Sequence, residues 1–139
     1  MPKPEKNCKD DQGNHKLQEA AQRFTIQNHS ILDALTKFQE ACAKTNRSIS
    51  KAVTKCGCVK IKAEKQHIPP TAKFSEASSY LSTHLEGCLC EKCKDVVEQE
   101  VGQTVFYLAA LCSDLCIDFN DVVQKEVDRV SALGVFSLA

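Results

Sequence analysis

The chain of 139 residues carries 18 basic and 18 acidic side chains, so its net charge is zero, and 42% of its residues are hydrophobic. This length suits one domain with a modest core, and the balanced charge excludes a dedicated polyanion-binding protein, so nucleic acid is not an expected partner. Since no stretch approaches the roughly 20 apolar residues of a membrane span, we expect a cytoplasmic protein without membrane contact.

The first half of the sequence predicts an arm followed by helix. Residues 1–14 are polar and rich in Lys and Pro, which predicts a disordered arm that is neither a signal peptide nor an anchor. Residues 15–139 are expected to form a single helical domain. Apolar side chains recur at helical spacing over 16–55, which predicts one long helix, or two helices with a break near Thr45-Asn46, where side chains that bond locally to the backbone gather.

The middle of the sequence predicts two further helices. Pro69-Pro70 breaks the chain, and a helix over 72–85 is expected to follow it and to be ended by Gly87. A longer helix is predicted over 90–116, because its apolar residues also recur at helical spacing.

The last helix completes a helical bundle. It is predicted to follow Asp118, whose carboxylate suits an N-cap, and to stop at Gly134. No stretch alternates as a strand does, so we predict an all-α bundle of four to five helices. In a chain this short, long amphipathic helices often bury their remaining apolar surface against another subunit, and we expect a homo-oligomer, either a dimer or a tetramer.

Nine cysteines are unusual in a chain of this size, and their odd number argues against a fully paired disulfide framework. They form two groups, Cys56-Gly57-Cys58 and Cys88-Leu89-Cys90-Glu91-Lys92-Cys93. A Cys-x-x-Cys step lets two thiolates reach one metal ion at about 2.3 Å, and a second pair completes a tetrahedron. We therefore predict a structural zinc site, with His84 and Cys88 as reserve ligands. The predicted ligands are Cys56, Cys58, Cys90 and Cys93.

Three alternatives remain for the two cysteine groups: free thiols, a redox disulfide that joins the groups, and an iron–sulfur cluster. Cys42, Cys112 and Cys116 lie on apolar helix faces and are expected to be small core residues. Cys8 falls in the predicted arm and is expected to be free.

Acidic residues before the long apolar helix form a second candidate site. Glu100 and Gln103 lie one turn apart on one helical face, whereas Glu98 points away from it. Acids at this spacing, joined by acids of a neighbouring helix, can hold Mg²⁺ together with substrate phosphates. Glutamine supplies no charge, so this face predicts a weakened magnesium site.

Residues 96–133 resemble the second half of the MazG-like all-α nucleoside triphosphate pyrophosphohydrolases. The resemblance lies in Glu100-Val-Gly-Gln-Thr-Val-Phe-Tyr-Leu-Ala-Ala-Leu and in Ile117-Asp-Phe-Asn-Asp-Val-Val-Gln-Lys-Glu. That family carries Glu-x-x-Asp in the first segment, where this chain has Gln103 in place of Asp. The family's earlier motif, Glu-Glu-x-x-Glu, keeps only Glu40 here. The resemblance thus implies a catalytic or nucleotide face made of Glu40, Glu98, Glu100 and Gln103.

Three functions follow from these patterns. The first is a MazG-like helical protein that no longer hydrolyses nucleotides and serves as a nucleotide-binding, regulatory or interaction module with a structural zinc. The second is an active Mg²⁺-dependent pyrophosphohydrolase, with Glu91 and Asp95 as further acids. The third is a thiol-based redox or metal sensor. A basic run indicates either a solvated helix face or contact with a nucleotide phosphate or nucleic acid. It comprises Lys51, Lys55, Lys60, Lys62 and Lys65.

Overall fold

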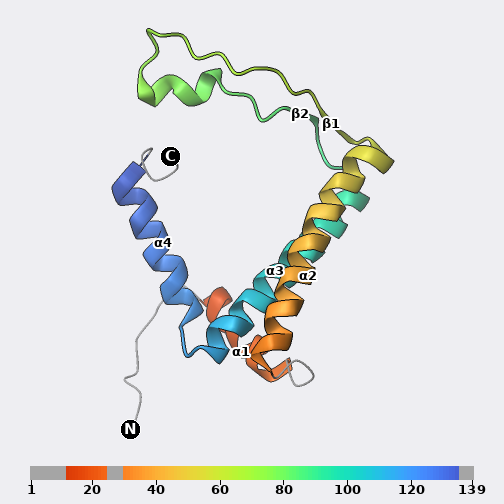
Figure 1. The fold of residues 1–139 in the computed structure, drawn as a ribbon, viewed down its shortest axis with the longest axis vertical. Helices are drawn as coiled ribbons and strands as arrows, with labels where there is room; N and C mark the ends of the chain where they lie inside the picture. Colours follow the sequence, from red (N-terminus) through yellow and green to blue (C-terminus); the bar gives the residue numbers. More distant parts are fainter. Residues whose placement is uncertain (1–11, 25–29, 135–139) are drawn as a thin grey trace. The chain divides into compact units, whose positions relative to one another are not determined.

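The computed structural model describes residues 12–24 and 30–134 (Figure 1). Most of these residues are helical, as the sequence predicts. Eleven of the 14 positions of the predicted arm lie outside the described residues, and the other three open the first helix. The elements are α1 (Gln12–Phe24), α2 (Ile31–Lys51), the π-helical turn η2 (Ala52–Cys56), β1 (Val59–Ile61), the 3-10 helix η3 (Phe74–Tyr80), β2 (Leu85–Gly87), α3 (Glu91–Asp114) and α4 (Phe119–Leu133).

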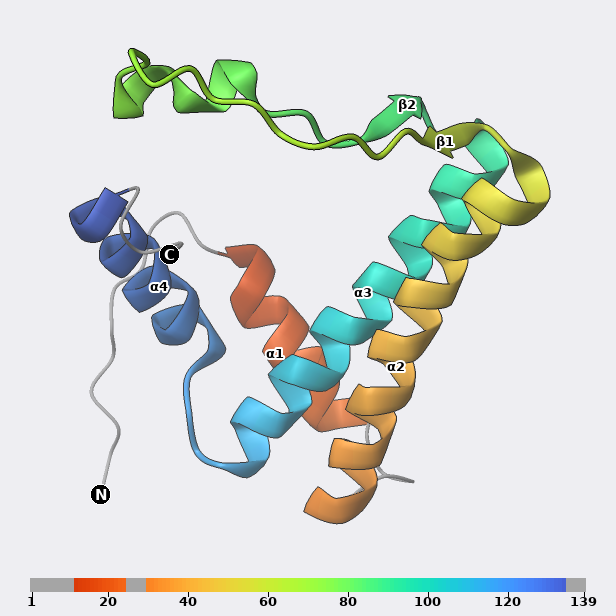
Figure 2. The same ribbon diagram turned by 45° about the horizontal axis from the view of Figure 1, so that its top comes forward.

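The chain divides into two compact units. The first unit comprises residues 1–42 and 101–139, and the second comprises residues 43–100. Helices α2 and α3 contribute to both units, and they lie side by side and antiparallel in both views (Figures 1 and 2). Among the described residues, no helix is both long enough and apolar enough to cross a bilayer.

The first unit has a small core made by α1, α3 and α4. Phe119 is its largest buried side chain, at 5% exposure, and it packs among small residues of α1 and α3. Four partly buried side chains cover this cluster, namely Leu17, Val105, Phe106 and Val123. Because alanines supply most of the core, the helices approach each other closely but bury little apolar area per residue.

The turn between α3 and α4 is held by a side chain of α1. The Gln18 amide donates to the carbonyl of Ile117 at 2.8 Å and accepts from the Phe119 N–H at 3.0 Å. The Asp118 carboxylate accepts from the Asp121 N–H at 3.1 Å, which confirms the predicted N-cap. Helix α4 ends at the residue before Gly134, also as predicted.

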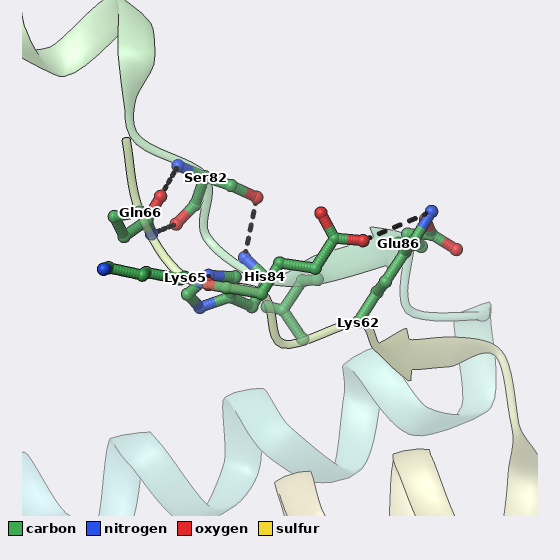
Figure 3. Close-up of a pocket in the computed structure, with 8 residues that line it drawn as sticks. Lys62, Lys65, Gln66, Ser82, His84 and Glu86 are labelled. Carbon is green, nitrogen blue, oxygen red and sulfur yellow. Dashed lines mark hydrogen bonds and ion pairs between the residues drawn. The ribbon is translucent and has the colours of Figure 1, made fainter. Parts of the chain in front are cut away.

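The second unit is an extended hairpin built on the ends of α2 and α3. Strands β1 and β2 pair antiparallel, with Val59 opposite Gly87 and Ile61 opposite Leu85. The hairpin continues beyond the strands as an arm, residues 62–84, whose two sides are joined by polar bonds. Figure 3 shows the Gln66 side chain bonded twice to the backbone of Ser82, at 2.8 and 3.1 Å.

The sequence left two alternatives for residues 16–55, and the structure differs from both. Helix α2 runs unbroken through Thr45-Asn46, where the hydroxyls of Ser48 and Ser50 bond to carbonyls three and four residues earlier, and α1 and α2 are separate helices. A further prediction is wrong in the second unit. The predicted helix over 72–85 is only the 3-10 helix η3, followed by strand β2. The strand depends on pairing with residues almost thirty positions earlier, which local periodicity does not reveal.

Candidate metal centre

The two cysteine groups meet where the hairpin joins the helices. Cys56 ends η2, Cys58 precedes β1, Cys90 precedes α3 and Cys93 lies in its first turn. Their four sulfur atoms lie within 4.8 Å of one another, close enough to hold one metal ion. The sulfur atoms of Cys56 and Cys90 lie 3.8 Å apart. The structure therefore brings together all four predicted thiol ligands, from two segments that are far apart in the sequence.

Local backbone geometry turns the first cysteine pair toward the second. Gly57 ends η2 with φ of 76°, a left-handed conformation, and its N–H donates to the carbonyl of Ala52 at 2.8 Å. This turn reverses the chain between Cys56 and Cys58, so that both thiols reach the same side. The Cys58 thiol lies 3.8 Å from the Ala52 carbonyl oxygen.

Gly87 holds the base of the hairpin against the first cysteine pair. Its φ is 85°, and a Cβ atom at this position would lie 2.6 Å from the backbone oxygen of Cys58. No side chain fits there without displacing Cys58. The sequence identified this glycine only as a helix end, so its role in packing two backbones together was missed.

We expect Gly87→Ala to weaken metal binding by about tenfold or more, since a left-handed alanine and a displaced strand each cost on the order of 1 kcal/mol or more. Affinity is measured by competition with a chromogenic chelator. Gly102→Ala is the matched control, because Gly102 lies in α3 with no atom within 4 Å of the added Cβ. That control should keep its affinity and gain about 0.5–1 kcal/mol of helix stability. Equal affinities for the two variants would contradict the role of Gly87.

The sulfur spacing matches a site for a single ion. A tetrahedron with metal–sulfur bonds of about 2.3 Å has sulfur–sulfur edges of about 3.8 Å. The distance between the Cys56 and Cys90 sulfurs has this value. The other sulfur–sulfur distances are at most 4.8 Å, so a small movement of the side chains would bring them to the same value. A polynuclear iron–sulfur cluster would hold its cysteines farther apart, because inorganic sulfides lie between them.

Contacts within the cluster shift the pKa values of three of its thiols. The backbone N–H of Cys93 donates to the Cys90 sulfur at 3.5 Å, and this bond, together with the Cys93 side chain, lowers the pKa of Cys90 to about 7. The hydrogen bond to Cys90, followed by burial, raises the pKa of Cys93 to about 12. The Cys93 side chain lowers the pKa of Cys56, but its contacts with Cys90 and Cys58 outweigh that effect and raise it overall.

The pKa values of Cys90 and Cys93 move in opposite directions. The Cys90 thiolate forms near neutral pH, and a Cys93 thiolate would have to form beside that negative charge. A bound divalent ion removes this repulsion and displaces the remaining protons.

The reserve ligands stay outside the cluster. The His84 ring nitrogen Nε2 lies 2.8 Å from the backbone oxygen of Glu64, on the arm (Figure 3). Cys88 is exposed and is not one of the four clustered thiols. Of the cysteines expected in the core, Cys112 is buried, and burial raises its pKa. Cys42 and Cys116 are exposed, so that expectation is wrong for them. The predicted free Cys8 lies outside the described residues.

The predicted acidic face is distributed over both units. Glu40 and Gln103 belong to the first unit, and Glu98 and Glu100 belong to the second. Glu40 pairs with Lys37 at 3.1 Å, and Glu98 pairs with Lys94 at 3.8 Å.

A magnesium site on this face would require several carboxylate oxygens around one point. Within each unit, no three carboxylates of the described residues converge in this way. The acidic face therefore stays a prediction, whereas the four thiols have the geometry of a metal site.

Comparisons with known protein families, with curated proteins and with solved structures found no match to this chain.

Proposed function

We propose that this chain is a MazG-like helical protein that acts as a non-catalytic nucleotide-binding, regulatory or interaction module built around a structural zinc ion. The observation that carries the proposal is the four-sulfur cluster at the base of the hairpin. Four thiolates fill the tetrahedral coordination of zinc and leave no position for water or substrate, so such a centre stabilises a fold and does not catalyse a reaction.

The second unit needs a stabilising element of this kind. Of residues 43–100, all of which the structure describes, only Ala52 and Val59 are buried. A unit of this size with so small a core is usually held by a metal ion, by disulfides or by another subunit. The zinc ion would connect the end of α2, the hairpin and the start of α3 at one point.

Two measurements test the proposal together. Protein purified under reducing conditions is expected to contain about one zinc ion per chain by elemental analysis, the ratio for one closed four-ligand site. Pyrophosphate release from a panel of nucleoside triphosphates with Mg²⁺ or Mn²⁺ is expected to stay at the background rate, because Gln103 supplies no charge to the acidic face. Release that Glu100→Gln abolishes would contradict the non-catalytic assignment and favour the pyrophosphohydrolase.

A thiol-based sensor is the second candidate, and the contact between Cys56 and Cys90 favours it. These sulfurs lie 3.8 Å apart, and a modest approach would bring them to the bonding distance of about 2.05 Å. A zinc-free protein in which one equivalent of oxidant joins these two cysteines, as seen by peptide mapping, would favour the sensor over the zinc module.

Self-association is part of the proposed function, because several apolar side chains of helix α4 are not covered by any residue that the structure describes. Val127 is 52% exposed and Leu133 is 49% exposed, and Val122 and Val130 lie on the same face. A second copy of the chain is the proposed occupant of this face. Light scattering is expected to give the mass of a dimer or tetramer, and Val127→Glu to shift it toward the monomer. The control Gln124→Ser, at an exposed polar position of the same helix, should leave the mass unchanged. A monomeric wild type would contradict the proposal.

A further inference from the structure

Beside the four thiols lies a cavity of about 520 Å³ that the zinc assignment does not explain. It lies between the end of α2 and the first turns of α3, within the second unit. Two of the cluster's cysteines, Cys56 and Cys93, line it together with the apolar Val96. Its remaining charged side chains are all lysines, namely Lys51, Lys55 and Lys92.

These three lysines have no acidic partner. Over residues 12–24 and 30–134, none of them forms an ion pair, and no carboxylate lines the cavity. The neighbouring Lys94 differs, because it pairs with Glu98 at 3.8 Å. Three ammonium groups around one cavity repel one another, and a negative charge nearby would offset this repulsion.

The metal centre supplies that charge. A divalent ion with four thiolates carries a net charge of −2, and two of the four cysteines line the cavity. Lys55 and Lys92 each directly precede one of these cysteines in the sequence, and Lys51 lies one helical turn before Lys55. A free anion in the cavity would therefore compete with the centre itself for the lysines.

We propose that Lys51, Lys55 and Lys92 form a cationic wall that compensates the negative charge of the four-thiolate centre and so determines how tightly it retains its metal. This inference rests on the proposed zinc site. The wall acts through charge, since ammonium groups within about one Debye length of a doubly negative centre lower its free energy, and this length is about 10 Å at 0.1 M salt.

The test is a titration of the full chain with zinc alone, in competition with a chromogenic chelator at about 0.1 M salt, near one Debye length of 10 Å. The variant Lys51→Gln/Lys55→Gln/Lys92→Gln is expected to bind zinc about five- to tenfold more weakly, and the matching triple arginine variant to bind it as the wild type does. At about 1 M salt the difference should largely vanish, because the Debye length falls to about 3 Å. A purely structural role of the lysines predicts neither the rescue by arginine nor the salt effect.

The matched control removes the same number of positive charges, but from strand β1's end of the hairpin and its arm, residues 62–84. Lys62→Gln/Lys65→Gln/Lys73→Gln removes three lysines that do not line the cavity, and its zinc affinity should change less than about twofold. Should the first triple variant fail to fold, the three single glutamine variants replace it, each with an expected loss of about twofold.

Two outcomes separate the inference from the zinc site itself. Unchanged affinity in the triple variant, or in all three single variants, with one zinc ion still bound per chain, overturns the cationic wall and leaves the zinc site intact. A wild-type chain that binds no zinc overturns the proposed function instead.

Discussion

Replacing Cys90 with serine is expected to weaken zinc binding by more than about 100-fold, because even changes outside the ligand shell of zinc sites cost about 10- to 100-fold. Cys90 is the thiol that contacts Cys56 and accepts the Cys93 N–H, so its loss removes a ligand and the centre of the hydrogen-bond network. Zinc content after dialysis should fall from about one per chain to near zero, and the second unit, which has almost no core, should lose protection from hydrogen exchange.

Cys88→Ser is the matched control for Cys90→Ser. Cys88 lies two residues earlier in the same segment, is exposed and is outside the sulfur cluster. It should retain zinc and the exchange pattern of the wild type. Wild-type zinc content in both variants would show that Cys90 is not a ligand. Loss of zinc from the Cys88 variant would show that Cys88 belongs to the ligand set.

Replacing Phe119 with alanine is expected to destabilise the first unit by about 3–5 kcal/mol, the usual cost of truncating a buried phenylalanine. Phe119 is 5% exposed, and its neighbours are mainly alanines, which are too short to fill the resulting cavity. Since small domains have only about 5–15 kcal/mol of stability, much of the folded population could be lost. Denaturant unfolding followed by circular dichroism measures the change.

The control for Phe119→Ala is Phe74→Ala, on the arm of the hairpin (residues 62–84). Phe74 is 70% exposed, so its truncation should change the free energy of unfolding by about 0.5 kcal/mol or less. The zinc content of both variants should stay at about one per chain, because Phe119 and the cysteines belong to different units. A Phe119 variant as stable as the wild type would mean that α4 does not depend on this core.

Helices α3 and α4 were predictable because their signals are local. Asp118 and Gly134 bound α4 through contacts within one turn, and the helical spacing that predicts 90–116 places α3 within two residues of its observed ends. The clustering of four cysteines was predictable for a similar reason, since a potential metal-binding pair is recognisable from the spacing of two cysteines.

The hairpin was not predictable, because its strands have three residues each and show no alternation. Their pairing depends on the fit of Gly87 against the Cys58 backbone, which no local pattern encodes. The sequence could not decide whether helix continues through Thr45-Asn46, since the hydroxyl groups nearby can end a helix or, as observed, bond along α2. The lysines of the cavity appeared only as part of a basic run, since Lys92 joins them from a separate helix.

The position of the thiols at both ends of the hairpin has a consequence for the order of folding. Joining Cys58 to Cys90 closes a loop of about 30 residues, and the lost chain entropy amounts to about 3 kcal/mol. Little of this cost can be recovered along the arm, which buries none of its side chains. The loop should therefore close late, after α2 and α3 have brought their ends together, and capture of the ion should be the last step that fixes the second unit.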